Sequence, residues 1–106
     1  RSKEKNENIF EVGSLKLNKN KSEVLIDGNY VDLTKQEFNI LELLATSNGD
    51  FVTPEEFLEK TWEKTNVSTA AVDIAMFRLR QKLSKYKKGS NLIKNKTGKG
   101  YLLNAS

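Results

Sequence analysis

The stretch AAVDIAMFRLRQKL, residues 70–83, carries apolar side chains on two sides of one predicted helix. At about 100° of rotation per residue, an apolar stripe forms on one side from Val72, Met76, Leu79 and Leu83. Such a stripe is typical of a helix face that packs on a core. Ile74 and Phe77 fall on the opposite side, beside Arg78. That second side is neither a core face nor an ordinary charged surface, so we predict that it contacts a partner.

Two interpretations of Ile74 and Phe77 are open at this point. Either side chain can pack on a sheet or hairpin of the same domain, an alternative with more weight for Phe77 because it lies nearer the edge of the face. If the face is free, the small Ala70 and Ala71 allow close approach of a partner. Arg78 then offers a planar fork suited to guanine or phosphate, and Ile74 can meet thymine methyl groups.

The composition indicates one folded, soluble domain. The chain has 106 residues, of which 37% are hydrophobic and 30% charged, in the range of globular domains. No run approaches the roughly 18 apolar residues of a membrane span, and the first residues lack the apolar core of a signal peptide. We therefore expect a cytoplasmic protein with no membrane span. The polar residues 1–8, RSKEKNEN, are predicted to be a linker, and residues 9–106 the domain.

The residue types argue against an enzyme. The chain has no cysteine and no histidine, which excludes disulfides, thiolate metal sites and Ser–His or Cys–His nucleophiles. Glu55 and Glu56 stand in the first turn of a predicted helix, where carboxylates are favoured by the helix dipole without any catalytic role. We therefore predict no enzymatic activity, no cofactor and no metal.

Charge is divided unevenly along the chain. Residues 1–63 hold 8 Lys/Arg against 13 Asp/Glu, a balance of −5. Residues 64–106 hold 10 Lys/Arg against the single Asp73, a balance of +9. This asymmetry favours a polyanionic partner, either nucleic acid or an anionic membrane surface. A basic face that is merely solvated is the plainer alternative.

Short alternating runs predict strands at both ends of the domain. Residues 9–33 alternate apolar and polar side chains and are interrupted by turn residues, among them Asp27-Gly28, a strong hairpin signal. They predict an antiparallel sheet of three or four strands. Residues 92–103, LIKNKTGKGYLL, predict a second hairpin with Gly98 and Gly100 at its tip.

Three helices are predicted between these strands. Thr34 and Glu37 form a capping box that begins the first helix, and Thr53 with Glu56 forms another that begins the second. Ser68 is a suitable cap for the third and longest helix, about residues 69–86. The predicted order is sheet, three helices, hairpin.

Four segments, in this order, resemble the effector domain of OmpR/PhoB-type response regulators. They are LTKQEFNILELLA (33–45), VTPEEFLEKTW (52–62), VDIAMFRLRQKL (72–83) and GKGYLL (98–103). The resemblance covers about residues 9–103. It implies an α+β fold, a winged helix-turn-helix with an N-terminal antiparallel sheet, three helices and a C-terminal β-hairpin wing. It also implies sequence-specific binding of double-stranded DNA by a two-component regulator, with the third helix in the major groove and the wing at an adjacent minor groove.

The resemblance assigns DNA-contacting positions residue by residue. Ile74 and Arg78 match base-facing positions, whereas Phe77 and Arg80 match positions that contact the DNA backbone. The predicted DNA-binding residues are Trp62, Ala71, Ile74, Phe77, Arg78, Arg80, Lys82, Asn95, Lys96, Thr97, Lys99 and Tyr101. Two positions depart from the family pattern: Thr97 stands where a wing arginine is frequent, and Phe77 where a polar residue or arginine is frequent.

The resemblance also implies partners. The loop of Glu63, Lys64, Thr65, Asn66 and Val67 matches the segment that can touch RNA polymerase. A receiver domain is expected to precede the effector domain, which is expected to be monomeric alone and to bind direct-repeat operators as a head-to-tail dimer. Two rival functions stay open: a winged-helix module that binds protein, and the DNA-binding domain of a membrane-tethered regulator.

Overall fold

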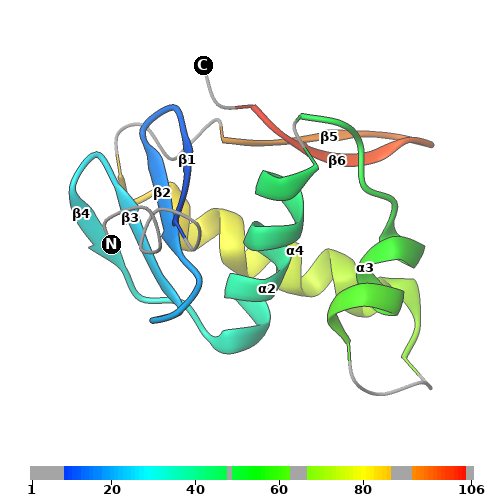
Figure 1. The fold of residues 1–106 in the computed structure, drawn as a ribbon. Coiled ribbons are helices and arrows are strands. Elements are labelled where there is room, and N and C mark those ends of the chain that lie inside the picture. Colours follow the sequence, from blue (N-terminus) through cyan, green and yellow to red (C-terminus); the bar gives the residue numbers. More distant parts are fainter. Residues whose placement is uncertain (1–8, 48, 63–66, 87–91, 105–106) are drawn as a thin grey trace.

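The computed structural model describes residues 9–47, 49–62, 67–86 and 92–104. The elements in chain order are β1 (Ile9–Val12), β2 (Leu15–Asn18), β3 (Glu23–Ile26), β4 (Asn29–Val31), α2 (Lys35–Thr46), α3 (Pro54–Thr61), α4 (Thr69–Leu83), β5 (Ile93–Lys96) and β6 (Gly100–Leu103). The sheet stands at one end of the molecule, the three helices follow it, and the β5–β6 hairpin extends along one side of the helices (Figure 1). The predicted α+β winged helix-turn-helix is confirmed.

Strands β1 to β4 form an antiparallel meander in sequence order. Alternation places Leu15, Leu17, Val24 and Ile26 on the buried face. The predicted Asp27-Gly28 turn joins β3 to β4, and both residues have positive φ, 54° and 85°, as a two-residue type I′ turn requires.

Both predicted capping boxes are present. The Thr34 hydroxyl accepts from the Glu37 amide, and the Glu37 carboxylate accepts from the Thr34 amide. Thr53 and Glu56 repeat this arrangement at the start of α3, followed by Pro54 in the first turn. These reciprocal bonds satisfy amides that a helix start otherwise leaves unpaired.

The third helix is shorter than predicted. It ends at Leu83 rather than near residue 86, and the backbone turns at Ser84. The turn lets the Tyr86 hydroxyl donate to the backbone oxygen of Tyr30 at 2.8 Å, which ties this end of α4 to the sheet. Ser68 is the N-cap residue as predicted, but its side chain makes no capping hydrogen bond.

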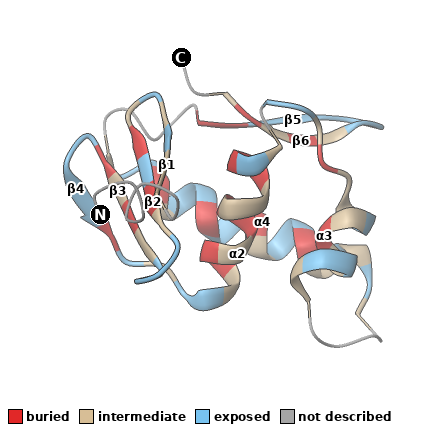
Figure 2. Ribbon diagram, in the orientation of Figure 1, coloured by how far each residue is buried: buried red, intermediate tan, exposed pale blue. Residues whose placement is uncertain are grey.

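The β5–β6 hairpin, called the wing below, is attached to the segment that precedes α3. Val52 and Tyr101 exchange two backbone hydrogen bonds, of 2.7 and 3.0 Å. A single core lies between the sheet, the helices and the wing (Figure 2). The predicted linker, residues 1–8, lies outside the described residues. Within the described residues, no helix combines the length and apolar character needed to cross a membrane.

Candidate nucleic-acid interface

Helix α4 has one face in the core and another in solvent. Val72, Met76, Leu79 and Leu83 are all buried, as the sequence predicts. Ile74 is 56% exposed and Phe77 61% exposed. The alternative in which these two side chains pack on the sheet or hairpin is therefore wrong.

The exposed side of α4 carries polar groups beside this apolar pair. Ile74, Phe77, Arg78 and Gln81 are all exposed and stand at i, i+3, i+4 and i+7, which makes them one continuous helix face. We call this set the outer face of α4. Phe77 borders the wing side, in a groove that Tyr101 also lines. Arg78 borders the opposite side, in a groove shared with Thr34 and Glu37 at the start of α2.

Gln81 is not among the predicted site residues, although the helical repeat places it on the same face as Ile74 and Arg78. It lines both grooves, so it lies between the wing side and the α2 side.

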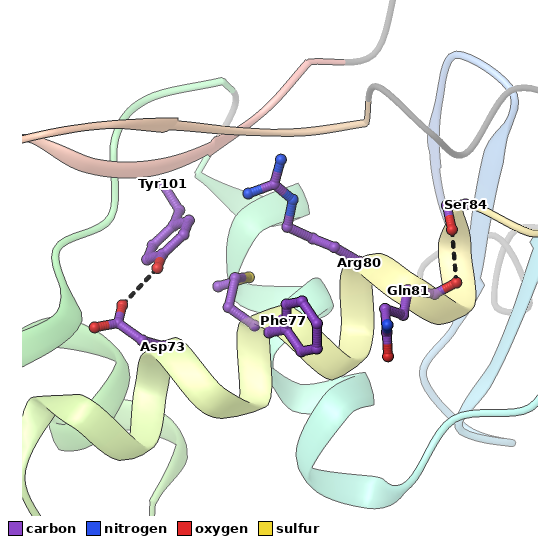
Figure 3. A pocket seen from close by; sticks show the side chains of 7 residues that line it. Asp73, Phe77, Arg80, Gln81, Ser84 and Tyr101 are labelled. Carbon is purple, nitrogen blue, oxygen red and sulfur yellow. Dashed lines mark hydrogen bonds between the residues drawn. The ribbon is translucent and has the colours of Figure 1, made fainter.

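Tyr101 joins the wing to α3 and α4. Its hydroxyl donates to Oδ1 of Asp73 at 2.6 Å (Figure 3), and its ring packs edge-on against Phe57 with centroids 6.1 Å apart. Burial, followed by the contact with the Asp73 carboxylate, raises the pKa of Tyr101 to about 12. The hydrogen bond from this hydroxyl to Asp73 holds the wing beside α4. Direct contact of Tyr101 with DNA stays a prediction.

Two further basic side chains of α4 point to opposite sides of the helix. Arg80 is exposed and reaches toward the wing, away from Gln81 (Figure 3). Lys82 is partly buried and donates to Oε1 of Glu37 at 2.7 Å. No local pattern predicts this pair, because 45 residues separate its members. A lysine ammonium has three donors, so the predicted contact of Lys82 with DNA stays open.

The wing presents its polar residues to solvent. Asn95, Lys96, Thr97 and Lys99 are exposed. The Lys99 ammonium lies 5.9 Å from the centroid of the Phe51 ring, near the outer limit of a cation–π contact. The predicted wing residues therefore form one basic, hydrogen-bonding edge next to α4.

The remaining predicted residues lie around α3. Trp62 follows α3 as its C-cap, and its side chain packs partly buried against the core. Ala71 is partly buried in the first turn of α4. Of the predicted RNA polymerase loop, residues 63–66 lie outside the described residues, and Val67 is partly buried.

Comparison with known proteins identifies the family. Residues 28–103 match the family described as "Transcriptional regulatory protein, C terminal". The chain belongs to this family. The prediction that the chain is the DNA-binding effector domain of an OmpR/PhoB-type transcriptional regulator is confirmed. The family is one of regulators and not a class of enzymes.

Individual members resemble the chain over most of its length. It is 35% identical to "Probable transcriptional regulator ycf27" of Galdieria sulphuraria over 100 residues, which are 92% of this chain and 39% of the relative. Response regulator DrrB of Thermotoga maritima, an OmpR/PhoB homolog, superposes with a TM-score of 0.78 at 33% identity, over 92% of this chain and 44% of DrrB. The Klebsiella pneumoniae RstA DNA-binding domain, solved in complex with the RstA box, gives a TM-score of 0.79 at 29% identity, over 92% of this chain and 98% of that domain. The chain thus spans about two fifths of the ycf27 relative.

Proposed function

We propose that this domain binds double-stranded DNA sequence-specifically by placing the outer face of α4 in the major groove. The observation that carries the proposal is the two-sided helix. One side is buried in the core, while the other presents Ile74, Phe77, Arg78 and Gln81 to solvent. The major groove of B-DNA is wide enough to admit an α-helix. The RstA DNA-binding domain, solved in complex with the RstA box, supports DNA binding by a domain of this fold.

The contacts divide into base readout and phosphate binding. Arg78 has the planar fork that matches the O6 and N7 acceptors of guanine. Arg80 and the exposed lysines of the wing, Lys96 and Lys99, supply phosphate contacts beside the groove. The backbone of Trp62, the small Ala71, and Lys82, Asn95, Thr97 and Tyr101 complete the proposed contact surface.

Selection from a random duplex library tests the function. An enriched sequence is expected, and its affinity should fall linearly with the logarithm of salt concentration as condensed cations are released. Fluorescence anisotropy of the selected duplex, from low to physiological salt, measures the slope. A library without enrichment, together with salt-insensitive binding to a protein partner, would favour the protein-binding module instead.

Arg78→Ala is expected to lose about 1–3 kcal/mol of binding free energy and to relax preference at one base position, because a bidentate guanine contact is lost. Repeating the selection with the variant measures both effects. Arg80→Ala is the matched control, a second exposed arginine on the same helix, which points toward the wing (Figure 3). It should weaken binding to every sequence alike. Unchanged selectivity in Arg78→Ala would refute the assignment.

Lys99→Ala is expected to weaken binding to all duplexes equally and to reduce the salt slope by about one unit, since one phosphate contact disappears. Lys21→Ala removes the same charge from an exposed turn between β2 and β3, at the end of the molecule opposite the wing tip (Figure 1). Its slope should match that of the wild type. A loss confined to one sequence would contradict the phosphate role of Lys99.

We further propose the setting in which this domain works. A receiver domain precedes it in the whole protein, the domain alone is monomeric, and two copies bind a direct repeat in the cytoplasm of a bacterium. RNA polymerase contact through residues 63–67 belongs to the same proposal. The receiver domain is supported by the coverage of response regulator DrrB, of which this chain matches 44%. Sedimentation with one half-site and with two distinguishes a single copy from a pair.

A further inference from the structure

The outer face of α4 exposes large apolar side chains next to charged ones. Among the described residues, the large hydrophobic side chains that stand exposed are Tyr30, Ile74 and Phe77. Tyr30 lies on the sheet, whereas the other two stand three positions apart on α4. Ile74 and Phe77 thus form one exposed apolar pair, in the middle of the surface proposed to enter the major groove.

The chemistry of this pair restricts what it can recognise there. Neither side chain can donate or accept a hydrogen bond. Of the groups that base pairs present in the major groove, the C5 methyl of thymine is the apolar one. Against a G·C pair, the same side chains would strip water from base-edge donors and acceptors without replacing it, which is unfavourable.

The spacing of the pair suits neighbouring base pairs. Three residues along a helix correspond to roughly 4.5 Å of axial rise, close to the roughly 3.4 Å between successive nucleotides of one strand. Arg78 follows Phe77 directly and faces the α2 side. The residue proposed to contact guanine therefore lies next to the apolar pair. Gln81 continues the same face and suits adenine.

We infer that Ile74 and Phe77 read thymine methyl groups, so that the preferred half-site has thymines beside the guanine contacted by Arg78. This inference rests on the proposed function, because it assigns a base to the same surface. Phe77 then acts as a specificity-determining residue at a position where the family frequently has a phosphate-binding one. At this position, a contact between Phe77 and a thymine methyl group replaces the phosphate contact that is frequent in the family.

Deoxyuridine substitution tests the inference. In the selected duplex, each thymine is replaced in turn by deoxyuridine, which keeps every hydrogen-bonding group and lacks only the methyl. Wild-type affinity is expected to fall about fourfold for each contacted methyl. Ile74→Ala and Phe77→Ala should each bind the thymine duplex more weakly and lose the response to uracil at one position. Arg78→Ala should keep the full response.

The outcomes separate the inference from the function on which it rests. If selection yields no enriched duplex, the proposed function fails, and the inference that Ile74 and Phe77 contact thymine methyl groups fails with it. If a duplex is selected but uracil changes the affinity at no position, the proposed contact with thymine methyl groups is refuted, while DNA binding itself is not. A uracil effect that persists in the Ile74→Ala/Phe77→Ala double variant also refutes it, since the methyl would then act through DNA shape. Unchanged thermal midpoints of these variants establish that they are folded.

Discussion

Gly100→Ala is expected to destabilise the domain by about 3–5 kcal/mol, from backbone strain and a steric clash together. Gly100 has φ +111°, a conformation that residues with a Cβ rarely adopt, and an added Cβ would lie 2.3 Å from the carbonyl oxygen of Val52. That oxygen cannot move away easily, because it accepts from the Tyr101 amide while the Val52 amide donates to Tyr101. Urea denaturation followed by circular dichroism measures the loss.

Gly98→Ala is the matched control for Gly100. Gly98 also has positive φ, +83°, but no atom lies within 4 Å of the position of its added Cβ. Only the backbone penalty of roughly 1–2 kcal/mol is expected. Equal losses for the two variants would contradict the clash with Val52. A larger loss for Gly100→Ala would establish that the approach of the wing to the segment before α3 requires a glycine.

Glu37→Gln is expected to cost about 1.5–3 kcal/mol of unfolding free energy, the range for hydrogen bonds to charged groups. Glutamine can still complete a capping box, so the substitution removes mainly the charge. The Glu37 carboxylate is buried, and the same oxygen accepts from Lys82 Nζ at 2.7 Å and from the Thr34 amide at 2.9 Å. Because Lys82 belongs to α4, the ion pair fixes this helix to the start of α2.

The effect of Glu37→Gln is expected to depend on pH. Burial alone raises the pKa of Glu37, but the hydrogen bonds from Lys82 and Thr34 and the lysine charge outweigh it, so the pKa lies below its ordinary value of 4.5. A carboxyl with a lowered pKa contributes stability that is present above that ordinary value and is lost as pH falls through the folded-state pKa. The difference in unfolding free energy between the wild type and Glu37→Gln should therefore shrink below about pH 4.5. A difference that stays constant into acid would contradict this role.

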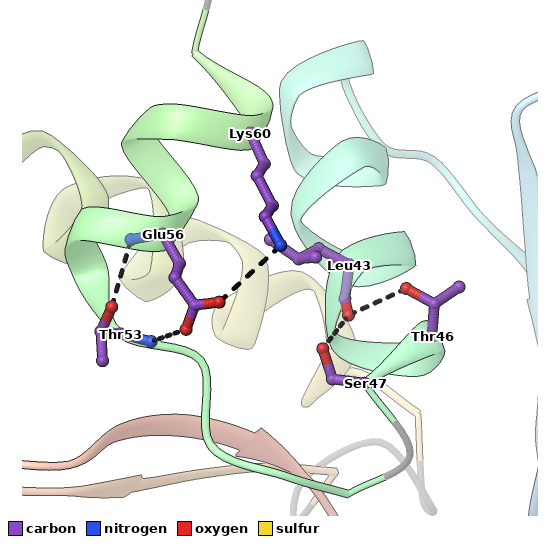
Figure 4. A network of polar contacts seen from close by, with 6 residues as sticks. All are labelled: Leu43, Thr46, Ser47, Thr53, Glu56 and Lys60. Atoms are coloured by element: carbon purple, nitrogen blue, oxygen red, sulfur yellow. Dashed lines mark hydrogen bonds and ion pairs between the residues drawn. The ribbon is translucent and has the colours of Figure 1, made fainter.

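Glu56→Gln is the matched control for Glu37. Glu56 completes the same capping box with Thr53 at the start of α3, but its basic neighbour is Lys60, one turn along the same helix, at 3.8 Å (Figure 4). The side chains of Lys60 and Glu56 are 55% and 42% exposed, and ion pairs at such exposure contribute little to stability. Glu56→Gln should cost less than about 0.5 kcal/mol. Similar losses for the two variants would show that the tertiary ion pair is unimportant.

The boundaries of most elements follow from local patterns. Thr34 and Thr53 begin their helices because each cap and its glutamate are three residues apart, a distance that any helix start brings together. Asp27-Gly28 turns the chain because both residues tolerate positive φ. The buried stripe of α4 depends on the helical repeat alone. Interactions of this range are encoded within a few residues, so the sequence is sufficient to predict them.

Tertiary structure decided where individual side chains of the site lie. Sequence could place Phe77 near the edge of a helix face, but only packing of the neighbouring elements left it 61% exposed. Lys82 meets Glu37 across 45 residues, and Tyr101 meets Asp73 across 28. Tyr86, just beyond the end of α4 at Leu83, likewise meets the backbone oxygen of Tyr30 across 56 residues. Such pairs form only after the core has set the distance between elements, so no local pattern contains them. By itself, therefore, the sequence determined the family, the order of elements and the two-sided helix, and the tertiary structure decided which polar groups are free to meet DNA.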